Sequence, residues 1–193
     1  MAVGSWKVNV STDYPQKVAT AVAKLTDEFF GAEYKPIAYL GSQVVNGINH
    51  AVLAEQTILN GKDTKNAVVI VFNEKPNTMD VSLVSINTVV SGGNGLGAVE
   101  IDMTDDIPQD VKIAFEKAFA GYVGLNIEPF VYVGQQVTKG IDYILMAETV
   151  PVTLNPTKGI AVVTVHSMDN TLTVSSLIPT AKEAGELNYA FTW

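Results

Sequence analysis

The chain has 193 residues, of which 47% are hydrophobic, and it carries a net charge of −8 without any arginine or cysteine. Without arginine it lacks the bidentate phosphate and guanine contacts on which most nucleic-acid binding depends, so no nucleic-acid partner is expected. Without cysteine it has no disulfide, no thiolate metal site and no thiol nucleophile. No apolar run approaches the roughly 18 residues of a membrane span, and no metal or cofactor is expected.

The sequence contains one unit twice. A shift of 93 positions (136 minus 43) aligns Gln43, Val44 and Gly47 with Gln136, Val137 and Gly140. The same shift aligns Gly4 with Gly97, Pro15 with Pro108, Gly31 with Gly124 and Tyr39 with Tyr132. A period of this size corresponds to a domain and not to a solenoid repeat. We therefore expect a first domain over residues 1–90, a glycine-rich linker over 91–97 and a second domain over 98–193.

Each copy is predicted to begin with a short strand and a helix. The extended stretches 6–10 and 99–103 are followed by cap-type residues and a proline, which are typical of a helix start. Apolar residues then recur at helical spacing, in the first copy at Val18, Ala21, Val22, Leu25 and Phe29. Gly31 and Gly124 are predicted to end the two helices, because glycine adopts the left-handed cap conformation easily.

The rest of each copy has the pattern of strands. Segments 34–44, 48–59, 67–72 and 79–89 are rich in Val, Ile, Thr and Tyr and are separated by turn residues. A helix that precedes such a meander has to cover one face of it. The predicted fold class is therefore α+β, with two tandem domains, each one helix packed on a four- or five-stranded antiparallel sheet. Ile48, Leu53 and strand 68–72 are expected to be buried against the first helix.

One hairpin motif carries a family resemblance. The first copy has the pattern Gln-x-Val-x-Gly at 43–47, and the second copy keeps Gln136, Val137 and Gly140. In its setting, after a helix and a glycine and before an apolar strand, the motif resembles the cystatin family, most of all the stefins. The resemblance implies two tandem cystatin-like domains. It also implies reversible, competitive inhibition of papain-like cysteine peptidases, by a wedge of an amino-terminal glycine and two hairpins.

The resemblance also implies which residues bind the peptidase. In the first copy they are Gly4, Gln43, Val44, Val45, Asn46, Gly47, Lys75, Pro76 and Asn77. The equivalents in the second copy are Gly97, Gln136, Val137, Thr138, Lys139 and Gly140. The first copy is expected to carry most of the inhibition, because the second has Thr138 and Lys139 inside its hairpin and Gly97 in a linker. The expected partner is a papain-like cysteine peptidase.

An alternative is a non-inhibitory structural or protein-binding scaffold, for example a particle or capsid component, in which the chain associates with itself. Strong inhibitors of the family carry Pro-Trp or Leu-Pro in the second hairpin, whereas residues 75–77 retain only a proline and 168–170 neither. Enzyme activity is not expected, because His50 and His166 are the two histidines and spacing indicates no partner for either. No signal peptide is visible at the start of the chain, which favours an intracellular protein.

Overall fold

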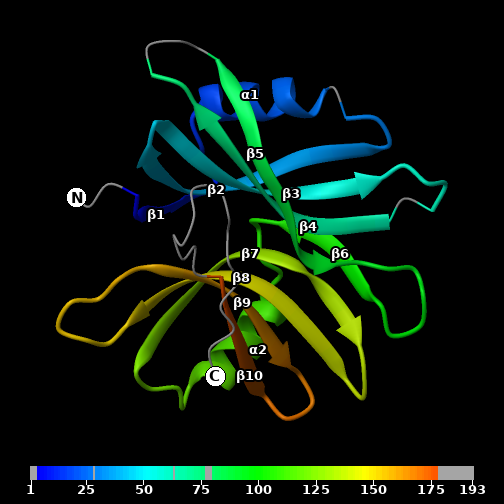
Figure 1. Cartoon of the computed structure of the whole chain (residues 1–193). Helices are drawn as coiled ribbons and strands as arrows, with labels where there is room; N and C mark the ends of the chain where they lie inside the picture. The colour runs from blue at the N-terminus through cyan, green and yellow to red at the C-terminus, as the bar shows by residue number, and fades with distance from the viewer. Residues whose placement is uncertain (1–3, 28, 63, 77–79, 178–193) are drawn as a thin grey trace. The chain divides into compact units, whose positions relative to one another are not determined.

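The structure, a computed structural model, describes residues 4–27, 29–62, 64–76 and 80–177. The chain divides into two compact units, with a boundary between Ser91 and Gly92, and each unit has a strand, a helix and four further strands (Figure 1). Unit 1 comprises β1 (Trp6–Ser11), α1 (Gln16–Thr26), β2 (Ala32–Val45), β3 (Gly47–Ile58), β4 (Thr64–Glu74) and β5 (Val81–Ser91). Unit 2 comprises β6 (Val99–Thr104), α2 (Gln109–Phe119), β7 (Leu125–Val137), β8 (Ile141–Pro151), β9 (Gly159–His166) and β10 (Thr171–Leu177).

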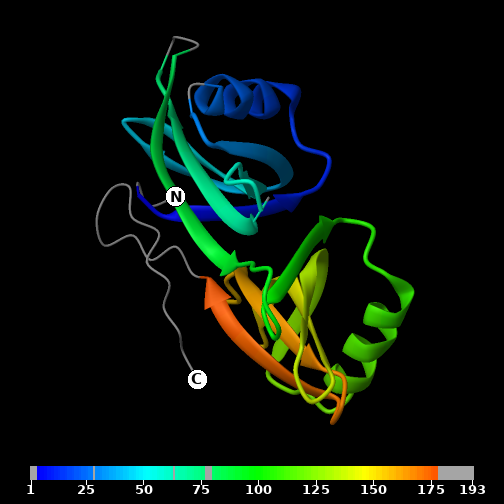
Figure 2. The ribbon, with the colours of Figure 1, turned by 90° about the vertical axis from the view of Figure 1, so that its right-hand side faces the viewer.

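Each unit holds one antiparallel sheet in which strands that follow one another in the chain are neighbours. The orders are β1-β2-β3-β4-β5 and β6-β7-β8-β9-β10. In unit 1, α1 lies across one face of the sheet (Figure 2). The core between them contains Val18 and Val22 of the helix with Val52, Ile70 and Phe72 of the sheet. The equivalent core of unit 2 contains Val111, Phe115, Leu145, Val163 and Val165.

The α+β fold class predicted from the sequence is wrong. Strands account for 56% of the residues and helices for 13%, so the structure is dominated by antiparallel sheet. The physical reason is the length of the elements. Each helix has only 11 residues, whereas β2 alone has 14 and continues as a strand up to the hairpin. None of the helices in the described ranges has the length and apolarity that crossing a membrane requires.

The predicted helix ends are also wrong. α1 ends at Thr26 and α2 at Phe119, several residues before Gly31 and Gly124. Phe29 was expected on the helix face, but it lies beyond the helix and packs edge-to-face on Tyr34, with ring centroids 6.0 Å apart. Gly31 instead accepts a hydrogen bond at its carbonyl from the Leu59 amide, at 2.9 Å. The apolar spacing therefore extends past the end of the helix, because Phe29 packs on a strand residue and not on the helix face.

Two residues predicted to lie against the helix do not do so. Ile48 is 38% exposed, because it lies at the first hairpin. Leu53 is fully buried, but its neighbours Val52 and Ala54 belong to the core near the helix, and side chains alternate along a strand. Leu53 therefore points to the other face of the sheet.

The repeat register breaks at the second hairpin. Up to the first hairpin it holds, since Val44 pairs with Ile48 and Val137 with Ile141, 93 positions later. In unit 1 the β4–β5 pairing ends at Glu74 and Val81, so six sequence positions separate the two paired strands. In unit 2 the β9–β10 pairing ends at His166 and Thr171, which leaves only 167–170. The 93-residue register therefore does not continue through this hairpin.

Candidate functional site

Three segments that are distant in the sequence meet at one end of the unit 1 sheet. Gly4 precedes β1, the turn Val44–Ile48 joins β2 to β3, and Lys75–Pro76 follow β4. The pairing of Trp6 with Gln43, and of Ile48 with Glu74, places all three at the same end. We call these residues the hairpin end of unit 1. Its position follows from the strand order, because connections between successive antiparallel strands alternate between the two ends of a sheet.

Gln43 braces this end from within. The residue is only 3% exposed, and its Nε2 donates a hydrogen bond of 2.7 Å to the Gly4 carbonyl. Its Oε1 accepts from Asn49 Nδ2 at 2.9 Å, and Asn49 Oδ1 accepts from Asn73 Nδ2 at 2.8 Å. The Gly4 amide also donates to the Val44 carbonyl, at 3.1 Å. These bonds tie β2, β3 and β4 to the segment before β1.

Gly47 fixes the first hairpin against the strand that leads to the second. Its φ of +103° is one that side chains rarely adopt. A Cβ at this position would collide with the Glu74 carbonyl oxygen and lie 3.0 Å from Asn73 Oδ1. The glycine is therefore required inside the protein itself, for the close approach of β3 and β4, whatever it contacts in a partner.

The remaining candidate residues of the first copy offer an apolar tip with polar neighbours. Val44 is 55% exposed, Asn46 is exposed and Val45 is half-buried. Lys75 and Pro76 are exposed, and the Lys75 amide donates to the Asp80 carbonyl at 3.1 Å, which extends the hairpin pairing. Asn77 lies outside the described residues. The described candidates thus come together, with Val44 as an exposed apolar side chain among them.

The second copy repeats the brace but not the tip. Gln136 Nε2 donates to the Gly97 carbonyl at 2.7 Å, as Gln43 does to Gly4. Val137, Thr138 and Lys139 are exposed, and the Thr138 amide donates to the Gly140 carbonyl at 2.9 Å. Gly140 has no left-handed φ, and a Cβ there would lie 3.1 Å from Met168 Cβ. Because its second hairpin is also shorter, unit 2 presents a different surface.

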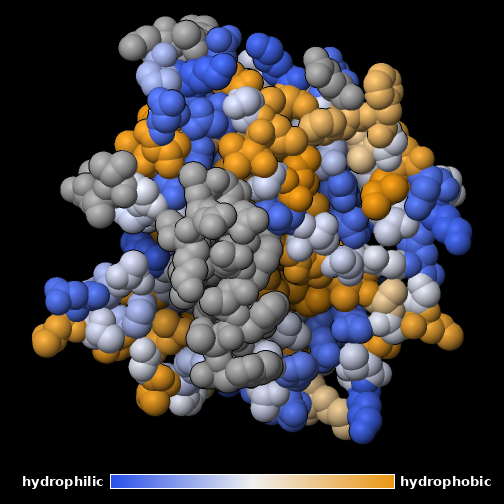
Figure 3. Space-filling view, in the orientation of Figure 1, coloured by the Kyte–Doolittle hydropathy of each residue, from blue (hydrophilic) through white to orange (hydrophobic). Residues whose placement is uncertain are grey.

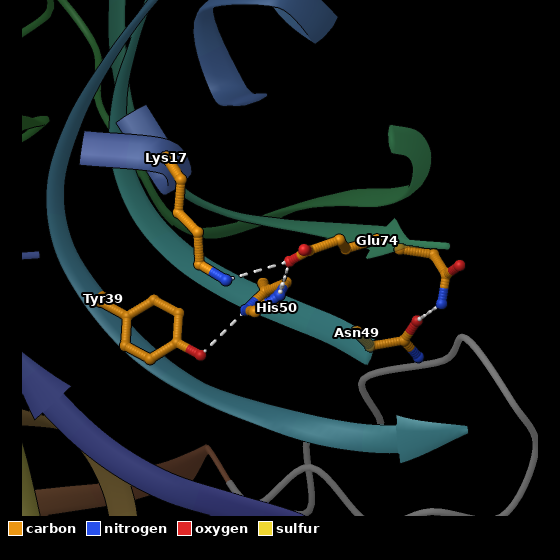
Figure 4. A network of polar contacts seen from close by, with 6 residues as sticks. Lys17, Tyr39, Asn49, His50 and Glu74 are labelled. Atoms are coloured by element: carbon orange, nitrogen blue, oxygen red, sulfur yellow. Dashed lines mark hydrogen bonds and ion pairs between the residues drawn. The ribbon is translucent and has the colours of Figure 1, made fainter. Parts of the chain in front are cut away.

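A second group of polar side chains, which sequence reasoning missed, surrounds His50 (Figure 4). His50 comes from β3, and its side chain is only 7% exposed. Its Nδ1 lies 3.0 Å from the Tyr39 hydroxyl and its Nε2 3.0 Å from Glu74 Oε2. Lys17 reaches from α1 to the same Glu74 oxygen, at 3.4 Å. The expectation that His50 has no partner is therefore wrong.

These contacts define the protonation state of the ring. An ionised carboxylate only accepts hydrogen bonds, so His50 donates Nε2–H to Glu74 and accepts at Nδ1 from Tyr39. Burial lowers the pKa of His50 from 6.5, although the bond to Glu74 works in the opposite direction. Burial also raises the pKa of Tyr39, which keeps its hydroxyl protonated. His50 is therefore neutral near pH 7.

Unit 2 has different chemistry at the equivalent positions. Tyr143 stands where unit 1 has His50, and its hydroxyl donates to Asp110 Oδ2 at 3.4 Å. His166, expected to have no partner, pairs with Asp142 at 3.0 Å and contacts the Thr173 hydroxyl at 3.1 Å. Within the described residues no group of three or more His, Asp or Glu side chains is arranged to hold a metal ion. The His50 group is thus particular to unit 1.

No protein-family model matches the sequence, and no curated protein sequence matches it. The resemblance of the hairpin motif to cystatins therefore stays a prediction that rests on the residues of this chain.

Proposed function

We propose that unit 1 is a reversible, competitive inhibitor of papain-like cysteine peptidases and that it inserts its hairpin end into the peptidase cleft. One observation carries the proposal: Gly4, the Val44–Ile48 turn and Lys75–Pro76 lie at one end of a single sheet. These are the three segments from which the cystatin resemblance builds its wedge. Their meeting depends on the strand register and not on the sequence motif alone.

The bonds within the hairpin end favour tight docking. Gly4 is held by its amide at the Val44 carbonyl and by its carbonyl at Gln43 Nε2. Gly47 packs directly on the backbone of β4. A surface that is already ordered loses little conformational entropy when it binds, so more of the contact energy appears as affinity. The exposed Val44 side chain supplies the apolar contact at its centre.

The test is inhibition of papain by the full chain, measured with a fluorogenic peptide substrate. The variant Val44→Arg places a charge at the tip without touching the core, and we expect it to raise the inhibition constant at least about tenfold. Its matched control is Val137→Arg, the equivalent position in unit 2, which should leave inhibition unchanged. Replacement of Gly47 is unsuitable as a test, because any side chain there would collide with the Glu74 carbonyl oxygen and disturb the fold itself.

Two results would contradict the inhibitor proposal. The proposal fails if the full chain does not inhibit papain at micromolar concentration, or if Val44→Arg and Val137→Arg inhibit equally. A third variant, Gln43→Ala, should weaken inhibition while the hairpin stays exposed, because it frees Gly4 from its brace. Circular dichroism and thermal unfolding of each variant distinguish lost binding from lost structure.

A scaffold function is the second candidate, and strand β5 favours it. β5 lies at the end of its sheet, has 11 residues and contains no charged side chain or proline. Figure 3 shows hydrophobic residues along the surface where β5 runs. Long edge strands without charge or proline are ready to pair with another strand, and proteins that avoid association usually protect them. β5 would then pair with β5 of a second copy of the chain.

Sedimentation of the purified chain tests this second candidate. Pairing through β5 should give a dimer, and Leu83→Lys, which places a charge on the exposed edge, should shift it to monomer. The control Val152→Lys charges an exposed apolar residue of unit 2 and should not change the mass. A monomer at all concentrations would exclude the scaffold arrangement.

A further inference from the structure

A pocket opens between helix α1 and strands β3, β4 and β5 of unit 1. Its volume is about 360 Å³, at the lower end of the range of about 300–1,000 Å³ typical of small-molecule sites. Its apolar part is lined by Val18, Ala21, Phe72 and Val81, and the polar groups around it include Lys17, Lys24, His50 and Glu74. The pocket is separate from the exposed tip at Val44.

The aromatic part of this pocket suits a flat ligand. The rings of His50 and Phe72 are stacked, with centroids 5.1 Å apart and planes 29° apart. Phe72 is almost fully buried, so only part of its ring faces the pocket. His50 is held in place by Tyr39 and Glu74 on its two nitrogens. An aromatic ring gains most from rigid aromatic and aliphatic walls, which keep their shape on binding.

The charges around the pocket favour an anion. Lys17 and Lys24 are both positive, Glu74 is negative and His50 is neutral near pH 7, so the lining carries one excess positive charge. Lys17 already contacts the Glu74 carboxylate at 3.4 Å. Lys24 makes no ion pair or hydrogen bond with any residue in the described part of the chain. Its ammonium is therefore the group available to a carboxylate.

Unit 2 carries different residues at two of the equivalent positions. Tyr143 replaces His50, packs against the unit 2 core and contacts Asp110, which replaces Lys17. The repeat thus substitutes a larger ring and a negative charge at two of the positions that form the pocket in unit 1. Lys117, the counterpart of Lys24, is retained. The two copies differ at other pocket positions but not at the lysine, so Lys117 is a matched control.

We propose that this pocket of unit 1 binds a small aromatic carboxylate, with the ring against Phe72 and Val18 and the carboxylate on Lys24. The neutral His50 and the Lys17–Glu74 pair form the polar rim. The proposal is independent of peptidase inhibition, because no residue of the exposed tip takes part in it. A ligand of one or two rings in a site that is partly open to solvent should bind with a Kd on the order of 0.1 mM.

The test titrates 1-naphthoate into the full ¹⁵N-labelled chain and follows amide and His50 ring resonances by NMR. We expect saturable shifts at Thr20, Ala21, Lys24 and Phe72, and several-fold weaker binding of the neutral analogue 1-naphthalenemethanol. Lys24→Gln should reduce the affinity about three- to tenfold, whereas Lys117→Gln should not change it. Thr20→Trp, at an exposed position on the pocket lining, should fill the space and abolish the shifts while the His50 network remains.

Several results would overturn the proposal. These are shifts that do not saturate in the low millimolar range, shifts spread equally over both units, equal binding of the carboxylate and the alcohol, or equal effects of Lys24→Gln and Lys117→Gln. The spectrum of each variant shows whether unit 1 is folded, so a loss of binding through unfolding is recognised directly. Inhibition of papain by the same samples is a separate measurement, and it can fail or succeed without affecting this result.

Discussion

At the scale of single residues, Gly41 permits a close crossing that no other residue would allow. β1 and β2 pair with a register irregularity at this point, and a Cβ on Gly41 would collide with the Lys7 carbonyl oxygen. Gly134 has the same role in unit 2, where a Cβ would collide with the Glu100 carbonyl. The two positions are equivalent in the repeat, so the bend of the sheet depends on a missing side chain in both units.

Replacement of this glycine should therefore be costly. We expect Gly41→Ala to destabilise unit 1 by about 2–4 kcal/mol, because the backbone of β1 has to move away. Gly95→Ala is the control, since a Cβ there meets nothing within 4 Å, and it should change stability by less than about 0.5 kcal/mol. Urea denaturation of both variants measures the difference. Equal midpoints would show that β1 adjusts without cost.

His50 should make unit 1 sensitive to acid. Its pKa is lowered from 6.5 by burial, and the groups that face it are Tyr39, Glu74 and Lys17. Between the folded pKa and 6.5 the unfolded chain binds more protons than the folded chain, so stability falls as the pH decreases through this window. We expect the free energy of unfolding to fall as the pH decreases from about 7.5 through 6.5.

The variant His50→Tyr, the residue of the second copy, isolates this effect. Its unfolding free energy should depend less on pH in the same window than that of the parent chain. The pKa of Glu74 is lowered from 4.5: burial would raise it, but the bonds to His50 and Lys17 outweigh burial. The stabilising contribution of Glu74 is therefore lost only at lower pH, outside the window. Identical pH profiles for the parent and His50→Tyr would contradict the assignment.

At the scale of elements, each sheet holds its helix through a narrow apolar stripe. Val18 and Val22 of α1 are buried, whereas Lys17 and Lys24 on the same helix are exposed. Val22→Ala should cost about 1.5–3 kcal/mol, because Val22 is fully buried between the helix and the sheet. Lys24→Ala should stay within about 0.5 kcal/mol. Denaturation midpoints that are the same for both variants would show that α1 contributes little to the core.

The elements also show what can be predicted from sequence. The repeat and the alternation within strands are local signals that appear twice, so the strands and both helices could be located. The helix end could not, because Phe29 continues the apolar spacing while it packs on Tyr34. The His50 site could not either, since Glu74 is 24 residues away and reaches His50 only through the β3–β4 register. Similarly, the shorter second hairpin of unit 2 depends on its pairing and not on residue identity.

At the scale of the whole molecule, each unit has a hydrophobic core between its helix and its sheet, and these two cores share no residue. The core of unit 1 centres on Val22, Ile70 and Phe72, and that of unit 2 on Val111, Leu145 and Val163. Phe72→Ala should cost unit 1 about 3–5 kcal/mol, because a large buried ring is removed. Hydrogen exchange followed by mass spectrometry should show lost protection in residues 4–91 and unchanged protection in 92–177.

The reciprocal variant, Leu145→Ala, completes the comparison. It should reduce protection in unit 2 and leave unit 1 protected, because Leu145 is buried only in the second core. If either variant reduced protection equally in both units, the chain would unfold as one cooperative body.

The glutamine brace has a consequence for the history of the chain. Gln43 and Gln136 each donate a 2.7 Å hydrogen bond to a glycine carbonyl at the matching position, Gly4 and Gly97. An identical bond in both copies is inherited most simply from the single unit that was duplicated. The His50 pocket and the longer second hairpin occur in unit 1 and not in unit 2, so they are differences that arose as the two copies diverged after the duplication. The ancestral unit therefore already tied its first strand to the hairpin, and later divergence gave the two descendants different surfaces on the same frame.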